Sequence, residues 1–234
     1  MKKIAIMQPY FLPYIGYFQL MNAVDEFIIY DNIQFTKRGW IHRNRILENG
    51  KDIYLTLPVK KDSDFLDIKE RYLADNFSKQ KNKILSKISN SYRKAPYFKD
   101  IFPIVEDIFS FDNTNLFDFV FNSIFVLKGF LGIETNLIIS SKIDIDHNLK
   151  SAYKVKAIVK KQKGDIYINP IGGVELYEKP DFKADNIDLL FLKTKEVSYK
   201  QFNDEFIQFL SIIDVLMFND LESINKMVKN FVLL

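Results

Sequence analysis

The order of apolar and polar residues predicts a chain that alternates between strands and helices. A short apolar run at 3–7 is followed by a loop, Gln8-Pro9-Tyr10-Phe11-Leu12-Pro13, which its two prolines keep out of a helix. A helix is predicted at 14–23 and a second apolar strand, EFIIYD, at 26–31. A strand, a tight loop, a helix and a strand in this order form a βαβ unit, which implies parallel pairing and a right-handed crossover.

A β-hairpin is predicted directly after the second strand. Asn49-Gly50 is a hairpin turn signal, and it joins the predicted strands at 43–47 and 53–59. The next segment, 62–75, is charged and is predicted to be irregular.

Helical spacing of apolar residues then predicts three consecutive helices before the alternation resumes. The predicted helices lie at 78–93, 96–109 and 115–130. The later elements are strands at 136–139, 165–168 and 189–192, and helices at 148–161, 206–218 and 221–231. No linker rich in Gly, Pro or Ser interrupts the chain. We therefore expect one α/β domain over residues 1–234, with a mainly parallel, Rossmann-like sheet, a helical insertion at about 60–130 and a small β-hairpin.

Composition and charge narrow the class of protein. The 234 residues are 47% apolar and 27% charged, which excludes a disordered chain, a collagen and a coiled coil. The net charge of +3 arises from 33 basic and 30 acidic residues, so we expect no DNA partner, although a phosphorylated substrate fits. The absence of cysteine excludes disulfides, thiolate metal sites and a cysteine nucleophile.

No segment has the pattern of a signal peptide or a membrane span. The start, MKKIAIMQPY, lacks the apolar core and cleavage site of a signal peptide. The apolar stretch 116–133 contains Asp118, Asn122 and Lys128, which favour a buried helix. We expect a cytoplasmic protein without stable membrane insertion, and the oligomeric state does not follow from the sequence.

The loop after the first strand is the first candidate for chemistry. Open parallel sheets bind ligands at the carboxyl ends of their strands, and the first strand–helix turn is a common phosphate cradle. Tyr14-Ile15-Gly16-Tyr17 has the H-x-G-H spacing of nucleotide-activating enzymes, with tyrosine in both histidine positions. We expect Gln8, Tyr10, Tyr14 and Tyr17 to be catalytic and Gly16 to contact substrate. The alternative is a proline-rich strand exit whose rings only pack the helix start.

The second candidate is a basic segment around the single tryptophan. Arginine binds oxyanions through two parallel hydrogen bonds, and tryptophan stacks on a base or a sugar. Strand alternation places Arg43 and Arg45 on one face and His42 and Asn44 on the other. We expect this segment to bind the diphosphate of a sugar carrier, with a solvated hairpin as the alternative. The expected substrate contacts are Gln34, Lys37, Trp40, Arg43, Asn44 and Arg45.

Several residues near other strand ends complete the candidates. Ser211 is predicted to cap a helix with Asp214 in its first turn, and neither residue needs a ligand. Asp144-Ile145-Asp146-His147 is interpreted as capping the next helix, so no metal is expected. The remaining expected substrate contacts are Asp31, Ser140, Lys142, Gly172, Gly173, Tyr199 and Gln201.

Five blocks of sequence together resemble the WbqC-like protein family over residues 4 to about 220. They are Ile6 to Trp40 with the following Arg43-Asn44-Arg45, Tyr54 to Val59, Tyr92 to Phe98, Tyr167 to Gly173, and Phe209 to Asp214. Two departures are Tyr54, where the family is expected to have tryptophan, and the lack of a Lys-His pair near Lys83. The resemblance implies a bacterial protein encoded among surface-polysaccharide genes, often O-antigen clusters, with a transferase role that attaches glycine or another amino acid to an amino sugar.

These observations lead us to expect a transferase or ligase that forms an amide on a nucleotide-linked amino sugar. The acyl or amino-acid group would be activated by ATP, or supplied as an acyl-CoA or an aminoacyl-tRNA. Two alternatives remain open at this point. One is a nucleotidyltransferase-like enzyme of the same pathway, and the other is a non-catalytic protein that binds nucleotide sugars or glycans. No catalytic base is identified by the sequence.

Overall fold

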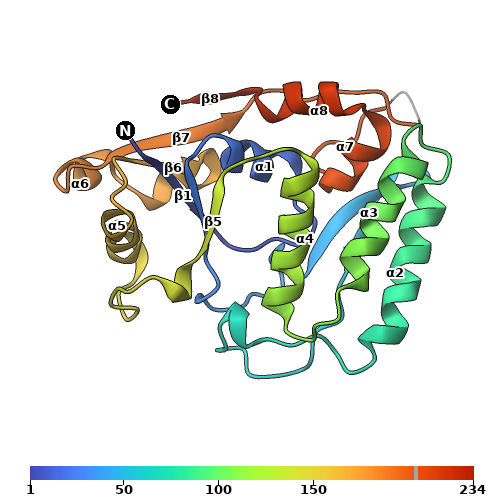
Figure 1. Ribbon diagram of the computed structural model, residues 1–234, viewed down its shortest axis with the longest axis horizontal. Helices are drawn as coiled ribbons and strands as arrows, with labels where there is room; N and C mark the ends of the chain where they lie inside the picture. The colour runs from blue at the N-terminus through green and yellow to red at the C-terminus, as the bar shows by residue number, and fades with distance from the viewer. Residues whose placement is uncertain (203–204) are drawn as a thin grey trace.

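A six-stranded sheet forms the centre of the molecule in the computed structural model, which describes residues 1–202 and 205–234 (Figure 1). The strand order is β5-β2-β1-β6-β7-β8, and every pair is parallel except β7 with β8. The strands are β1 (Lys3–Met7), β2 (Glu26–Ile29), β5 (Asn136–Ile139), β6 (Ile166–Pro170), β7 (Asp188–Thr194) and β8 (Phe231–Leu233). This confirms the expected α/β class with a mainly parallel sheet.

Helices cover both faces of the sheet. Because successive strand side chains point to opposite faces, Ile4 and Ile6 of β1 belong to one core and Ala5 to the other. The smaller core packs beneath α5 (Ser151–Lys161) and α6 (Lys179–Lys183), which lie together at one end of Figure 1. The larger core packs against helices of the opposite face, α1 (Ile15–Asn22), α4 (Leu116–Phe130), α7 (Ile212–Phe218) and α8 (Leu221–Val228).

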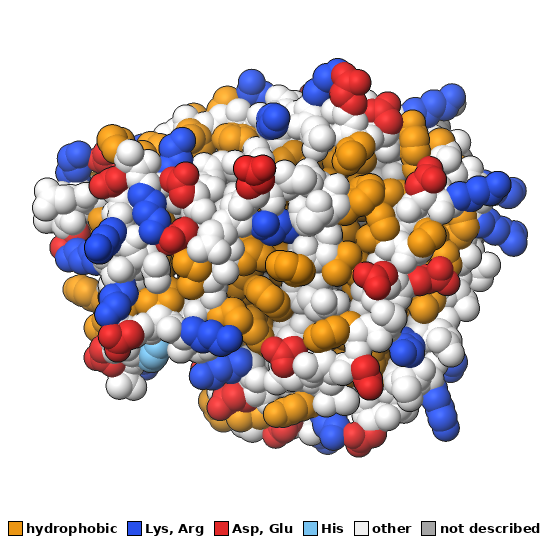
Figure 2. Space-filling model, in the orientation of Figure 1, with side chains coloured by type: hydrophobic (Ala, Val, Ile, Leu, Met, Phe, Trp, Pro, Cys, Tyr) orange, Lys and Arg blue, Asp and Glu red, His pale blue; other side chains and the backbone are white. Residues whose placement is uncertain are grey.

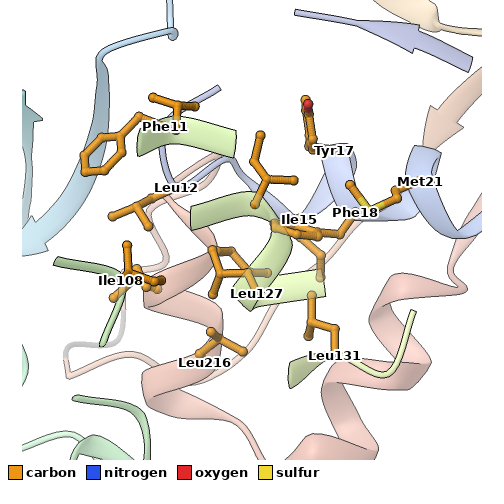
Figure 3. Close-up of a cluster of buried hydrophobic side chains, with 14 of the residues drawn as sticks. Phe11, Leu12, Ile15, Tyr17, Phe18, Met21, Ile108, Leu127, Leu131 and Leu216 are labelled. Atoms are coloured by element: carbon orange, nitrogen blue, oxygen red, sulfur yellow. The ribbon is translucent and has the colours of Figure 1, made fainter. Parts of the chain in front are cut away.

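The segment between β2 and β5 forms the antiparallel hairpin and the inserted helices. The hairpin pairs β3 (Arg43–Glu48) with β4 (Lys51–Thr56) through the Asn49-Gly50 turn. It is followed by the 3₁₀ helix η1 (Ile68–Glu70) and by α2 (Phe77–Tyr92) and α3 (Phe98–Ser110), which precede α4. The insertion shares the larger core with sheet residues such as Ala5 and Phe27. In that core, Leu12 and Ile15 gather with Ile108 of α3 and Leu127 of α4 (Figure 3).

The C-terminal third differs from the sequence predictions. The helix predicted at 206–218 begins only at Ile212, since Phe209 has a left-handed backbone (φ 57°) and Ser211 caps the helix through the amide of Ile213. The helix predicted at 221–231 ends at Val228, and the chain continues into β8. No element was expected at the 3₁₀ helix η2 (Ser140–Lys142). The Gly172-Gly173 turn, after which a short helix was expected, lies within the 3₁₀ helix η3 (Ile171–Leu176), and the short helix α6 follows it. The helix expected at 148–161 starts at Ser151 without a side-chain cap, so the capping interpretation of Asp146 is wrong.

The surface carries both signs of charge. On the face shown in Figure 2, basic and acidic side chains are interspersed around apolar side chains near the middle of the view. That distribution agrees with the small net charge of +3. Within the described residues, no helix is both long and apolar enough to cross a membrane.

Candidate functional site

A cavity opens where the strand order reverses. From β1 the chain moves to β2 on one side, and it later returns to β6 on the other side of β1. Ligands of open α/β sheets bind at the carboxyl ends of the strands at such a switch point. The cavity has a volume of about 460 Å³ and is lined by the ends of β1, β6 and β7, the hairpin and Phe209. We call it the switch-point cavity.

Three of the sequence-predicted segments meet in the switch-point cavity. The first loop, the basic hairpin and the turn after β6 all contribute side chains or backbone to its wall. The predicted residues that line it are Tyr10, Tyr14, Gly16, Trp40, Asn44, Arg45, Gly172 and Gly173.

Two tyrosines of the first loop present protonated hydroxyls to the site. The Tyr14 ring lies directly over Gly16, where a Cβ atom would be only 2.4 Å from Cε2 of that ring. Burial raises the pKa of Tyr14 and of Tyr10, and the nearby Tyr14 raises the pKa of Tyr10 further. Both hydroxyls therefore remain hydrogen-bond donors at neutral pH.

The other two residues of the first-loop prediction lie behind the cavity wall. The Tyr17 side chain is 1% exposed, and its ring packs 5.1 Å from that of Phe27. Its hydroxyl donates to the Gln8 carbonyl at 3.1 Å, which fixes the exit of β1. Neither Gln8 nor Tyr17 lines the cavity.

The hairpin contributes Asn44, which holds the first loop in place, and the cationic side chain of Arg45. The buried Asn44 amide donates to the carbonyls of Phe11 (3.0 Å) and Leu12 (2.8 Å), so it holds the first loop against β3. The Arg45 guanidinium lies 5.8 Å from the Trp40 ring centroid. It pairs with Asp52 at 3.0 Å and donates to the Phe209 carbonyl at 3.3 Å. Arg45 Nε is buried and has no partner among the described residues.

The remaining polar residues of this segment bind their own loops. Arg43 donates to the Arg38 carbonyl at 2.7 Å and lies 4.7 Å from the centroid of the Tyr54 ring. Gln34 donates to the Asp64 carbonyl at 2.7 Å, and Lys37 pairs with the Asp64 carboxylate at 2.6 Å. None of the three lines the switch-point cavity.

The turn after β6 lines the cavity and packs against Asn169. Asn169, at the end of β6, is 6% exposed and accepts the Tyr167 hydroxyl at 3.0 Å. A Cβ atom at Gly173 would lie 2.2 Å from the Asn169 amide nitrogen, so a larger residue would displace that side chain. Gly172 is exposed, with open space where a Cβ would be.

A separate polar cluster joins the ends of β2 and β5. Asp31 accepts the Ser141 amide at 2.8 Å and the Ser141 hydroxyl at 2.5 Å. The Ser140 hydroxyl donates to Asn32, whose amide contacts His147 Nδ1 at 2.8 Å. The hydrogen bonds of Asp31 and Ser140 therefore connect the segments that follow β2 and β5. The neighbouring Lys142 is exposed. Within the described residues, no group of three or more His, Asp and Glu side chains could hold a metal ion.

Tyr199 and Gln201 surround a buried carboxyl group. Asp214 accepts the Tyr199 hydroxyl at 2.6 Å, the Gln201 amide at 2.7 Å and the Tyr92 hydroxyl at 2.9 Å. Burial raises the pKa of Asp214 and outweighs the opposing effect of the three hydrogen bonds. The predicted cap is present, because the Ser211 hydroxyl accepts from the amide of Ile213. The polar atoms of this group thus serve the packing of α7.

Some residues near the sheet edge were not found from the sequence. Thr194 and Phe209 line the switch-point cavity, yet no local motif marks either residue. Lys154 is 5% exposed and donates to the Asn32 carbonyl at 3.3 Å, but it was not among the residues singled out from the sequence. Its position four residues before the buried Ile158 places it on the apolar face, and this spacing is the signal that was available.

The match to a family model covers the sequence segments that line the cavity. A family model described as the WbqC-like protein family matches residues 8–226. The chain belongs to the WbqC-like protein family. It is 52% identical over 60 residues to "Uncharacterized protein Rv1507c" of Mycobacterium tuberculosis. That match covers 26% of this chain and 26% of the relative, so the chain spans about a quarter of that protein. No solved structure matches.

Proposed function

We propose that this WbqC-family protein transfers an acyl or aminoacyl group to the amino group of a nucleotide-linked amino sugar. The observation that carries the proposal is the meeting of an arginine, a tryptophan and two protonated tyrosine hydroxyls in one cavity at the switch point. The pathway expected from the family resemblance is bacterial surface-polysaccharide synthesis, including O-antigen. The activated group comes from an acyl-CoA, an aminoacyl-tRNA or an ATP-dependent adenylate.

Arg45 and Trp40 supply the binding of the nucleotide sugar. A diphosphate accepts charge-assisted hydrogen bonds from a guanidinium group, and the Arg45 side chain lines the cavity and remains 26% exposed. The Trp40 ring offers a stacking surface for the base or the sugar. The carboxyl edge of the sheet, where both residues lie, is the usual position for such ligands in this architecture.

The chemistry assigned to the cavity needs little from the protein beyond positioning and charge stabilisation. The sugar amine attacks the acyl carbon, a C–N bond forms, and the bond to the leaving group breaks. The leaving group is the thiol of coenzyme A, the ribose hydroxyl of the tRNA or the phosphate of AMP. The proton lost by the amine leaves with that group. The tyrosine hydroxyls of Tyr10 and Tyr14 donate to the oxyanion of the tetrahedral intermediate. The nearby Arg45 cation favours the neutral, nucleophilic form of the amine.

Replacing Arg45 with alanine tests the proposed binding of the nucleotide sugar, and replacing Arg43 on the same strand is the matched control. Arg45→Ala removes a charge-assisted contact worth about 1.5–3 kcal/mol, so affinity for a nucleotide-linked amino sugar falls tenfold or more in calorimetric titration. Arg43→Ala leaves that affinity unchanged, because its guanidinium binds the Arg38 carbonyl instead. Equal affinities for wild type, Arg45→Ala and Arg43→Ala across UDP-, dTDP- and GDP-linked amino sugars contradict the assignment.

A non-catalytic binding role is the second candidate. It is favoured by the described lining residues of the switch-point cavity, which include no carboxylate and no imidazole. Mass spectrometry after incubation with the nucleotide sugar and each activated donor separates the functions. A sugar product heavier by the acyl group supports the transferase. Binding without any product favours the binding protein. In a separate incubation with nucleoside triphosphates and sugar phosphates, pyrophosphate release with no amino acid present favours a nucleotidyltransferase.

A further inference from the structure

We propose that a second, apolar cavity beside the switch-point cavity holds the hydrocarbon chain of an acyl thioester donor. This inference rests on the proposed transferase and narrows its donor from any acyl or aminoacyl group to one with an apolar chain. The second cavity has a volume of about 260 Å³. Its apolar wall is formed by Ile15, Val197, Tyr199, Phe206, Leu210 and Val215. We call it the acyl cavity.

The size and lining of the acyl cavity suit a hydrocarbon group. An engineered protein cavity of about 150 Å³ with a comparable aliphatic and aromatic lining binds benzene. The Tyr199 ring faces this space, while its hydroxyl donates to Asp214 at 2.6 Å. The Tyr199 hydroxyl is thus already used, so this residue offers the cavity an apolar surface. The charged and amide residues of the lining, Lys195, Glu196 and Gln208, are exposed, whereas the apolar Leu210 and Val215 are buried.

Tyr14, Thr194 and Phe209 line both cavities and therefore form the boundary between them. The rings of Tyr14 and Phe209 meet edge to face, with centroids 6.4 Å apart. Phe209 is 65% exposed despite its size, and it has a left-handed backbone with φ of 57°. Residues held in such a conformation are concentrated at ligand sites, where the surrounding structure determines them. Here the Phe209 carbonyl is held by Arg45.

This boundary places the reacting groups. With the chain in the acyl cavity and the amino sugar in the switch-point cavity, the thioester carbonyl lies beside Tyr14. The amine nitrogen forms a bond to the carbonyl carbon and the C–S bond breaks. The amine proton passes to the departing thiolate, so no oxidant or further reactant is needed. The Tyr14 hydroxyl serves as the oxyanion donor in this arrangement.

A chain-length series measures whether the acyl cavity is used. Acetyl-, butyryl-, hexanoyl- and octanoyl-CoA are titrated into the full-length protein. Each methylene that becomes buried strengthens binding about fourfold, the factor that corresponds to about 0.8 kcal/mol. Hexanoyl-CoA therefore binds about a hundredfold or more tighter than acetyl-CoA. Free octanoate is included to separate binding of the chain alone from binding of the thioester.

Two variants at one position connect the chain-length effect to this cavity. Val197→Trp fills the space and Val197→Asp charges it, so both abolish the dependence on chain length. Val126→Trp is the matched control, since Val126 is a half-buried valine of α4 that lines neither cavity. Binding of the nucleotide-linked amino sugar is measured for each variant, and retained affinity shows that the variant is folded.

The outcomes separate this inference from the proposed function. Loss of the chain-length effect in both Val197 variants, with nucleotide-sugar affinity retained, supports the acyl cavity. Equal affinity for all four acyl-CoA esters overturns it, as does a chain-length effect that survives both changes. Chain-length-dependent binding in a protein that binds no nucleotide sugar supports the acyl cavity while overturning the proposed acceptor. Octanoate binding as tightly as octanoyl-CoA supports the chain site and removes the thioester from the assignment.

Discussion

Replacing Gly16 with alanine should lower activity without lowering stability. A Cβ atom at this position would lie 2.4 Å from Cε2, 2.6 Å from Cζ and 2.6 Å from the hydroxyl oxygen of Tyr14. Those distances are too short for real contacts, so the Tyr14 ring must move. The ring is the outer end of a rotatable side chain, and its movement does not require the backbone to shift. Gly16 is the second residue of α1, where alanine is favoured over glycine by up to about 1 kcal/mol.

The expected cost falls on catalysis because the displaced group is the proposed oxyanion donor. Loss of one such donor typically lowers kcat by about 10²–10³-fold. The assay is single-turnover acyl transfer followed by mass spectrometry, with the melting temperature measured on the same preparation. Gly16→Ala should keep or raise the melting temperature and lose at least about a hundredfold in rate. Affinity for the nucleotide sugar should change much less, since Arg45 and Trp40 are untouched.

Two controls make the result specific. Gly129→Ala introduces the same methyl group into α4, where nothing lies within 4 Å of the new atom, so it should leave the rate unchanged. In a protein that already carries Tyr14→Phe, the hydroxyl is absent and Gly16→Ala should cost little further rate. The reasoning is refuted if Gly16→Ala retains full activity. It is also refuted if rate and melting temperature fall together, because Gly16 would then serve only the fold.

Two further predictions concern stability. Burial, followed by the charges of Arg43 and Arg71, lowers the pKa of His42 from 6.5 to about 4. The unfolded state therefore binds a proton more readily than the folded state, and stability falls as the pH drops from 6.5 towards 4. Melting temperatures between pH 4.5 and 7.5 should therefore vary less in His42→Phe than in wild type or His147→Phe, and an unchanged slope contradicts this cause. Tyr92→Phe removes a hydroxyl that donates to the Asp214 carboxyl group and accepts the buried amide of Leu47. Urea unfolding should therefore show a free energy of unfolding lower by about 2 kcal/mol or more, and a decrease below about 0.5 kcal/mol would exclude this network as a stabilising element.

The first half of the fold could be predicted because its signals are local. The βαβ unit follows from two apolar runs around a proline-containing loop, and the hairpin follows from Asn49-Gly50. The C-terminal errors arise from non-local effects. The apolar pattern before Ser211 continues a helical spacing, but Phe209 adopts a left-handed backbone whose carbonyl Arg45 contacts. Likewise, β8 replaces a helical end because β7 offers it an unpaired edge.

The candidate site could be predicted in outline but not in detail. The first loop, the hairpin and the Gly172-Gly173 turn were each singled out from the sequence, and the structure brings all three to one cavity. The sequence pattern was not enough to separate Arg43 from Arg45, because both belong to the same face of one strand. Their partners, the Arg38 carbonyl for one and the Phe209 carbonyl for the other, depend on how distant loops fold over that face.

Backbone hydrogen bonds hold the boundary between the two cavities in place before any ligand arrives. The Ser211 amide donates to the Arg45 carbonyl at 2.8 Å, and the Ile212 amide donates to the Pro13 carbonyl at 2.8 Å. The Ser211 hydroxyl donates to the Leu12 carbonyl, also at 2.8 Å. These bonds fasten the residues beside Phe209 to the residues beside Tyr14, although the two segments are far apart in sequence. A boundary fixed in this way needs little reorganisation when charge develops next to it, which is the condition under which a hydroxyl donor is most effective.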